Sequence, residues 1–131
     1  EVRNQLIYLQ DLVPTVYDLV GIKKPNHLEF ISQINALKSS KASSHRKAIY
    51  SAYLQEAQRM VTDGHYKLFF IPASKDAYLF DLEKDPQETN NLFGSPQYKR
   101  IVKRLCAEYQ KLSKESGDTF NLAAIYPELF Q

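Results

Sequence analysis

The residues of this chain that could do chemistry are three histidines and one cysteine. His27, His45 and His65 are far apart in the sequence, and no two of them have the spacing of a helical or hairpin metal site. Cys106 has no second cysteine to pair with, and it borders the apolar face of a predicted helix, so we expect it to pack in the core. Of the histidines, His45 is the best candidate for a site, because it lies in a Ser/Lys-rich loop.

A cluster of acidic side chains is the other candidate for chemistry. Asp81, Glu83, Asp85 and Glu88 fall within the stretch LFDLEKDPQETNNL. An EF-hand calcium loop needs oxygen ligands at alternating positions and a central glycine, whereas this stretch has Leu82 and Pro86 at such places. We therefore interpret it as a turn in which the Asp85 carboxylate accepts hydrogen bonds from backbone amides.

Length and composition indicate one globular domain. The chain has 131 residues, of which 44% are hydrophobic and 24% charged, as in ordinary folded proteins. The longest wholly apolar run, 68–71, is too short to cross a bilayer, and residues 1–10 do not read as a signal peptide. The net charge of +2 comes from lysines and arginines interspersed with acids. We therefore expect neither a membrane nor a nucleic acid as a partner.

The first third of the chain has helical periodicity. Asp11 offers an N-cap and Gly21 a stop, which predicts a helix over residues 12–20. Asn26 followed by Glu29 has the form of a capping box, and apolar residues at helical spacing extend from there to Leu37. A second helix of about three turns is therefore predicted, followed by a loop, KSSKASSHRK.

The rest of the chain predicts a sheet and one long helix. Alternating residues predict four antiparallel strands over 48–53, 58–62, 65–71 and 77–82, with a tight turn at Asp63-Gly64. Ser95 and Pro96 begin a helix of residues 96–116, and the apolar tail after Gly117 is expected to dock on another surface. The predicted fold class is α+β: a four-stranded antiparallel sheet packed by a long C-terminal helix and preceded by two short helices. The expected division is a helical lead-in, 1–45, and a sheet, helix and tail, 46–131, in a single compact unit.

Four blocks of the sequence, taken in order, resemble the C-terminal part of formylglycine-dependent sulfatases of the alkaline-phosphatase-like superfamily. Residues 11–15 read like the family's Asp-x-x-Pro-Thr helix start, and residues 59–68 like its Arg-x-Val-x-x-Gly-x-Tyr-Lys-Leu hairpin. Residues 79–82 and 85–92 resemble its Leu-Tyr-Asp-Leu strand and Asp-Pro-x-Glu-x-x-Asn-Leu turn. The resemblance extends over residues 5 to about 115.

The catalytic motifs of that family do not occur in this chain. The family's nucleophile lies in a Cys-or-Ser-x-Pro-x-Arg motif, whereas Cys106 is followed by Ala-Glu-Tyr. The resemblance therefore implies a C-terminal fragment that is inactive alone, contains no cofactor, catalytic residue or metal ligand, and belongs to a parent sulfatase that uses calcium and formylglycine. The implied partners are the parent's own N-terminal catalytic domain and a sulfated substrate, expected to be a carbohydrate. The implied location is periplasmic or secreted.

The resemblance also suggests where substrate could be contacted. In such enzymes the connection between the first two strands of the small sheet can approach the active-site cleft, and here that connection reads LQEAQ, residues 54–58. The candidate substrate-binding residues are Gln55, Gln58 and Arg59, with His45 as a further candidate. An ordinary hairpin loop is the alternative. An exposed apolar patch on the first helix and the tail is expected, with self-association of the isolated piece.

Two other functions remain compatible with the residues. The sheet aromatics could serve an independent module that binds carbohydrate or single-stranded nucleic acid, although core packing is the ordinary role of such residues. The chain could also be the equivalent piece of a related phosphodiesterase or phosphatase.

Overall fold

The computed structural model describes residues 3–54 and 57–130. They fall into two compact units, residues 1–47 and residues 48–131, which meet in sequence at Lys47 and Ala48. We refer to them as the first and second unit and describe each by itself.

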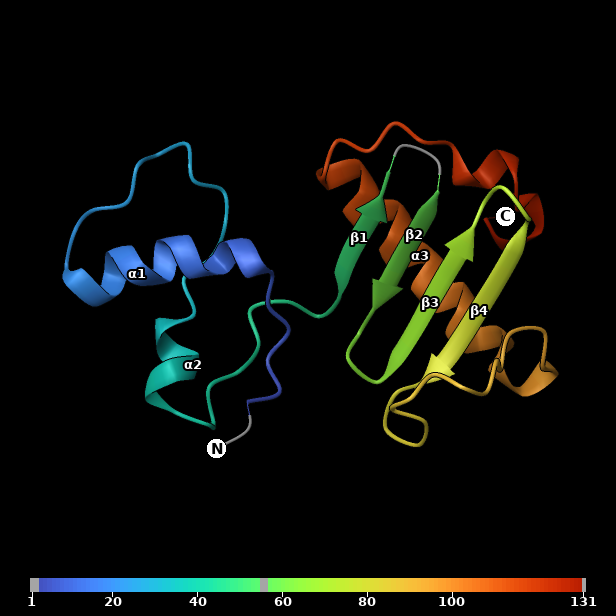
Figure 1. The fold of residues 1–131 in the computed structure, drawn as a ribbon, viewed down its shortest axis with the longest axis horizontal. Helices are drawn as coiled ribbons and strands as arrows, with labels where there is room; N and C mark the ends of the chain where they lie inside the picture. Colours follow the sequence, from blue (N-terminus) through green and yellow to red (C-terminus); the bar gives the residue numbers. More distant parts are fainter. Residues whose placement is uncertain (1–2, 55–56, 131) are drawn as a thin grey trace. The chain divides into compact units, whose positions relative to one another are not determined.

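The first unit contains one regular helix and one short helix (Figure 1). A single 3-10 turn, Leu9–Asp11, leads into α1, Leu12–Val20, and α2 is Ile34–Lys38. The prediction of a helix over residues 12–20 is confirmed. Gly21 ends α1 with φ +70°, a left-handed conformation that glycine adopts without steric strain.

The predicted three-turn helix after Asn26 is wrong, since only α2 forms near its C-terminal end. The physical reason is tertiary hydrogen bonding. The backbone amide of Ile31 donates to Asp11 Oδ1 at 3.1 Å, and that of Gln33 donates to Thr15 Oγ1 at 2.8 Å. In a helix, both amides would instead donate to backbone carbonyls one turn earlier. The bonds to Asp11 and Thr15 therefore hold residues 31–33 in an irregular conformation.

The second unit contains the predicted four-stranded antiparallel sheet, in the order β1-β2-β3-β4 (Figure 1). The strands are β1, Ile49–Tyr53; β2, Gln58–Thr62; β3, Tyr66–Ile71; and β4, Asp76–Asp81. Each bound lies within one residue of its prediction. Ser51, Met60, Phe69 and Tyr78 are register partners in one row across the sheet. Since side chains alternate along a strand, this row lies on the opposite face from Tyr50, Val61 and Leu68.

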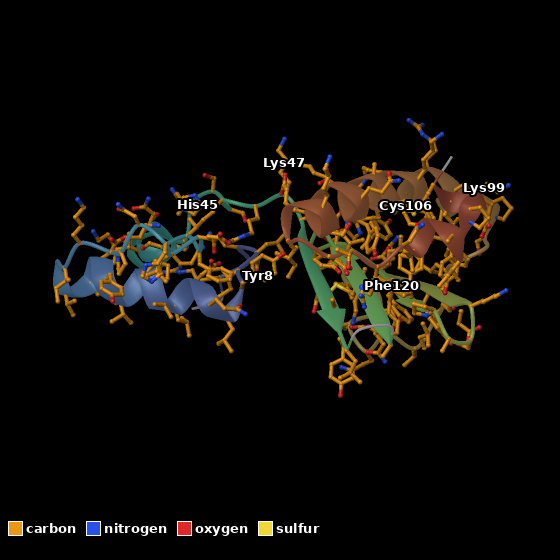
Figure 2. The ribbon with its side chains drawn as sticks, turned by 90° about the horizontal axis from the view of Figure 1, so that it is seen from above. Tyr8, His45, Lys47, Lys99, Cys106 and Phe120 are labelled. Carbon is orange, nitrogen blue, oxygen red and sulfur yellow. The ribbon has the colours of Figure 1, made fainter. Side chains whose placement is uncertain are left out.

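One face of the sheet packs against α3, Lys99–Glu115, which follows a 3-10 turn, Pro96–Tyr98 (Figure 1). Val61, Leu68, Phe70 and Leu79 from the sheet and Leu105 from the helix are completely buried. Cys106 belongs to this core (Figure 2), so its predicted packing role is confirmed.

The tail after α3 completes the same core through two 3-10 turns, Leu122–Ala124 and Pro127–Leu129. Leu122 and Tyr126 are buried, and the Tyr126 hydroxyl donates to the carbonyls of Ile71 and Asp76. The tail therefore docks, as predicted, but on its own sheet. The expectation that it forms part of an exposed apolar patch is wrong for these two residues.

Among the described residues, no helix has both the length and the apolar character needed to cross a membrane.

Candidate functional site

The structure places the predicted site residues in different surroundings. His45 lies exposed in the loop of the first unit (Figure 2), whereas Gln58 and Arg59 are in β2 of the second unit. Gln55 lies outside the described residues. Gln58 and Arg59 are adjacent in a strand, so their side chains point to opposite faces of the sheet. Their assignment to substrate binding stays a prediction.

Arg59 is buried on the helix-packed face, where it forms an ion pair with Asp118. Its Nε donates to Asp118 Oδ2 at 2.7 Å and its Nη2 to Oδ1 at 3.2 Å. Nη1 donates to the carbonyls of Leu54, at 3.2 Å, and Gln58, at 2.9 Å. The guanidinium carbon also lies 4.7 Å from the centre of the Phe120 ring, in the segment after α3 (Figure 2). Arg59 thus joins the β1–β2 connection to the chain beyond α3.

Asp118 is the acceptor at the centre of this cluster. It accepts hydrogen bonds from the Tyr50 hydroxyl and from the backbone amide of Phe120, in addition to those from Arg59. Burial alone would raise the pKa of its carboxyl, but the bonds from Arg59 and Tyr50 outweigh burial and hold the pKa below its usual value. Burial and the contact with Asp118 raise the pKa of Tyr50. The cluster is therefore a carboxylate with a protonated phenol and a guanidinium.

The Asp-x-x-Pro-Thr block forms a similar cluster in the first unit. The Asp11 side chain is fully buried and accepts two hydrogen bonds from Arg46, at 2.5 and 2.7 Å. It also accepts from the amides of Tyr8 and Ile31 and from the Gln33 side chain. Burial would raise the Asp11 pKa, but the contacts with Arg46 and the two amides hold it below its usual value. The Asp11 carboxylate therefore has all of its hydrogen-bond partners within the first unit. The Asp-x-x-Pro-Thr block accordingly has a structural role there.

The stretch from Asp81 to Leu92 covers the outer edge of β4. Asn91 Oδ1 accepts from the amide of Leu79 at 3.0 Å, and its Nδ2 donates to the carbonyl of Ala77 at 3.3 Å. The Leu92 amide adds a bond to the Leu79 carbonyl at 2.8 Å. These contacts occupy backbone groups that an edge strand would otherwise leave open to another chain.

The turn before Asn91 is held by Asp85, as predicted. The Asp85 carboxylate accepts from the Asn90 amide at 2.8 Å and from the Thr89 hydroxyl at 3.1 Å. Hydrogen bonds from the Asn90 and Thr89 amides lower the pKa of Asp85. No group of three or more histidine, cysteine, aspartate or glutamate side chains that could hold a metal ion occurs among the described residues.

The open face of the sheet, opposite α3, is aromatic and shallowly hollowed. One depression of about 270 Å³ lies over β3 and β4 and includes Phe69, Tyr78 and Phe80 in its lining. A second, of about 130 Å³, is lined by Tyr53 and Gln58 together with Ser51, Arg59, Met60, Lys67 and Phe69. Phe69 and Lys67 line both, so the two depressions adjoin. Lys67 Nζ is paired with Glu88 Oε2 at 2.6 Å.

A larger cavity, of about 480 Å³, lies between residues 93–95, the first turns of α3 and the tail. Phe93, Val102 and Leu129 give it apolar walls, while Lys99, Lys103 and Glu128 also line it. Its lining contains none of the predicted site residues.

Comparison with known proteins identifies the family. The family model described as "N-sulphoglucosamine sulphohydrolase, C-terminal" matches residues 1–115. An uncharacterised protein of Haemophilus influenzae is 33% identical over 119 residues, covering 88% of this chain and 60% of that protein. A delta 4,5-hexuronate-2-O-sulfatase of Bacteroides thetaiotaomicron is 31% identical over 114 residues, covering 80% of this chain and 24% of the enzyme.

A solved structure gives the same result. The structure of a 2-O GAG sulfatase superposes with a TM-score of 0.68 at 30% identity, covering 82% of this chain and 25% of that one. This chain belongs to the sulfatase C-terminal domain family and has the α+β fold of that domain. It spans 60% of the Haemophilus protein and about a quarter of each of the two sulfatases.

Proposed function

We propose that the complete protein containing this chain hydrolyses sulfuric esters of a carbohydrate, and that this chain is the domain that completes its fold. The observation that carries the proposal is the match of residues 1–115 to the sulfatase C-terminal family. The carbohydrate is supported by the similarity to a hexuronate-2-O-sulfatase and to a 2-O GAG sulfatase.

The division of labour follows from the residues of this chain. The buried charged side chains Asp11 and Arg59 are engaged in structural pairs, Asp11 with Arg46 and Arg59 with Asp118. Cys106 is buried, and burial raises the pKa of its thiol to about 12, so it is no nucleophile. The formylglycine nucleophile and the calcium site would belong to the remainder of the complete protein, where the metal would stabilise the charge of the sulfate oxygens.

The remainder of the protein is also the partner that fits α1. Leu12, Val16, Leu19 and Val20 are 52–61% exposed, although they are large apolar side chains on one helix. A helix that is apolar around most of its surface is typical of the interior of a larger protein. We therefore assign this face to contact with the catalytic domain, and expect the isolated chain to self-associate through it.

The β1–β2 connection is the part of the second unit that we assign to the substrate cleft. Gln58 and Gln55 are the proposed contacts with substrate hydroxyl groups, and His45, in the first unit, is a separate candidate for a substrate contact. Location outside the cytoplasm, in the periplasm or secreted, is proposed on the resemblance alone.

The coding sequence upstream of Glu1 tests this function. We expect it to encode a Cys-or-Ser-x-Pro-x-Arg motif together with aspartates that could bind calcium. A start codon immediately upstream, or an unrelated domain, would instead favour an independent binding module and would refute the proposal.

A further inference from the structure

Three features characterise the described part of the β1–β2 connection. Tyr53 and Leu54 are 62% and 68% exposed, and they are the exposed large hydrophobic side chains found among the described residues of the second unit. Leu54 has φ +50°, a left-handed conformation that is uncommon for a residue with a side chain. The Leu54 carbonyl accepts a hydrogen bond from the buried Arg59 side chain.

The Arg59–Asp118 pair explains how this conformation persists. The guanidinium bonds the carbonyls at both ends of the connection, Leu54 and Gln58, while Asp118 holds the guanidinium from the other side. The side chains of Arg59 and Asp118 are 3% and 12% exposed. Hydrogen bonds between charged partners in such a dry setting are strong and directional. The pair therefore fixes the backbone from which Tyr53 projects.

Tyr53 and Gln58 face the open side of the sheet as direct register partners. They line the depression of about 130 Å³, in which Met60 and Phe69 supply apolar surface and Ser51 a hydroxyl. A pyranose ring has an apolar C–H face that packs on an aromatic ring and hydroxyl groups that pair with an amide. Lys67 lines the depression but is paired with Glu88, so it is neutralised as a sulfate-binding cation.

We propose that Tyr53 and Gln58 bind an unsulfated part of a sugar chain, and that Arg59 and Asp118 are positioning residues that hold this contact. The role of this site in turnover rests on the proposed sulfatase function. Its binding of sugar is independent of that function. Arg59 also borders this depression, and on this proposal it acts through its hydrogen bonds to the Leu54 and Gln58 carbonyls.

The first test compares two substrates of the complete protein, a sulfated oligosaccharide and a small aryl sulfate. Loss of one aromatic contact in Tyr53→Ala is expected to raise the KM for the oligosaccharide roughly tenfold, a much larger change than in the KM for the aryl sulfate. Tyr53→Phe keeps the ring and should retain most of the affinity. An equal rise in KM for both substrates would assign Tyr53 to the fold or to a protein contact and would overturn the proposal. An unchanged KM for both substrates would also overturn it.

The second test addresses the positioning pair by hydrogen exchange of the complete protein. Asp118→Asn is expected to speed exchange of the Tyr53 and Leu54 amides roughly tenfold, and to raise the KM for the oligosaccharide. The matched control is Arg104→Gln, which breaks the ion pair of Arg104 with Asp63 at the other end of β2. It should change neither quantity. Faster exchange over the whole sheet, or an unchanged KM with a loosened connection, would refute the positioning role.

A third measurement separates this proposal from the proposed function. Titration of the complete protein with the desulfated oligosaccharide should show binding that Tyr53→Ala weakens by the same factor, even if no sulfatase activity is found. Binding that is absent, or unaffected by the substitution, would contradict the sugar site.

Discussion

Asp11 and Arg46, 35 residues apart, form a two-fold hydrogen-bonded ion pair in which the carboxylate is fully buried. The aspartate begins the first helical block and the arginine lies in the loop just before the sheet. The guanidinium of Arg46 also lies 4.8 Å from the centre of the Tyr8 ring. This charged contact therefore links the start of α1 to the end of the first unit, and its contribution can be tested.

Removal of the cation should destabilise the first unit. Arg46→Ala leaves the Asp11 carboxylate buried with amide partners only, and breaking a buried ion pair in this way costs about 3–5 kcal/mol. Chemical denaturation followed by circular dichroism would measure it. Lys47→Ala, at an exposed neighbour, is the control and should change stability by less than about 0.5 kcal/mol. Equal effects of the two substitutions would contradict the assignment.

The same pair predicts the direction of a pH effect. The Asp11 pKa is lowered in the folded protein from its ordinary value of 3.8, so the folded state binds its proton less readily than the unfolded state. The stability from Asp11 is therefore fully present above about pH 4 and is lost as pH falls through the folded pKa. Asp11→Asn should lose stability at neutral pH, and the difference from the wild-type protein should shrink on acidification. A difference that is constant with pH would show that the charge contributes nothing.

Asn91 should contribute to stability through the edge of the sheet. Asn91→Ala removes the side-chain bonds to Leu79 and Ala77 and should lower stability by about 1 kcal/mol. It should also raise aggregation, because the edge of β4 loses partners. Asn90→Ala is the matched control, since its backbone amide still bonds Asp85. Light scattering and thermal denaturation would check both effects, and an Asn91 variant that behaves like the Asn90 variant would refute the edge role.

The apolar face of α1 should matter only when its partner is present. In the complete protein, Leu19→Gln removes a side chain that we assign to a domain interface, so a loss of about 2 kcal/mol is expected. Asp18→Asn, at an exposed polar position of the same helix, should be nearly neutral. In the isolated chain, Leu19→Gln should reduce self-association, as analytical ultracentrifugation would show. A neutral Leu19 variant in the complete protein would place this face in solvent.

Most of the fold can be predicted from the sequence because strand alternation, turns and helix ends depend on residues that are close together in the chain. The strands and α1 were predicted within one residue, since alternation, the turn at Gly64 and the stop at Gly21 act over a few residues. The helix after Asn26 failed because Asp11 and Thr15, more than ten residues away, take the amides that it would need. No local pattern records such a competition.

The candidate site shows the same limit. The residue type and place of Arg59 suggest a substrate contact, which stays a prediction, whereas its ion pair with Asp118, 59 residues away, has no signal in the sequence. The proposed role of Tyr53 does have a signal in the sequence, since the period-two pattern places Tyr53 on the same face of the sheet as its register partner Gln58. The hydrogen bonds of Asn91 to the edge of β4 have no such signal, since an asparagine in a turn is ordinarily expected to stabilise the backbone conformation of the turn itself.

The decisive measurement is release of inorganic sulfate from a sulfated oligosaccharide by the complete protein. We expect release that is lost when the cysteine or serine of the expected upstream nucleophile motif is replaced by alanine, and that is retained in Cys106→Ala. Sulfate release that survives loss of the upstream residue but not of Cys106, or no release from any sulfated saccharide by a correctly processed protein, would show that the complete protein is not a sulfatase of this kind.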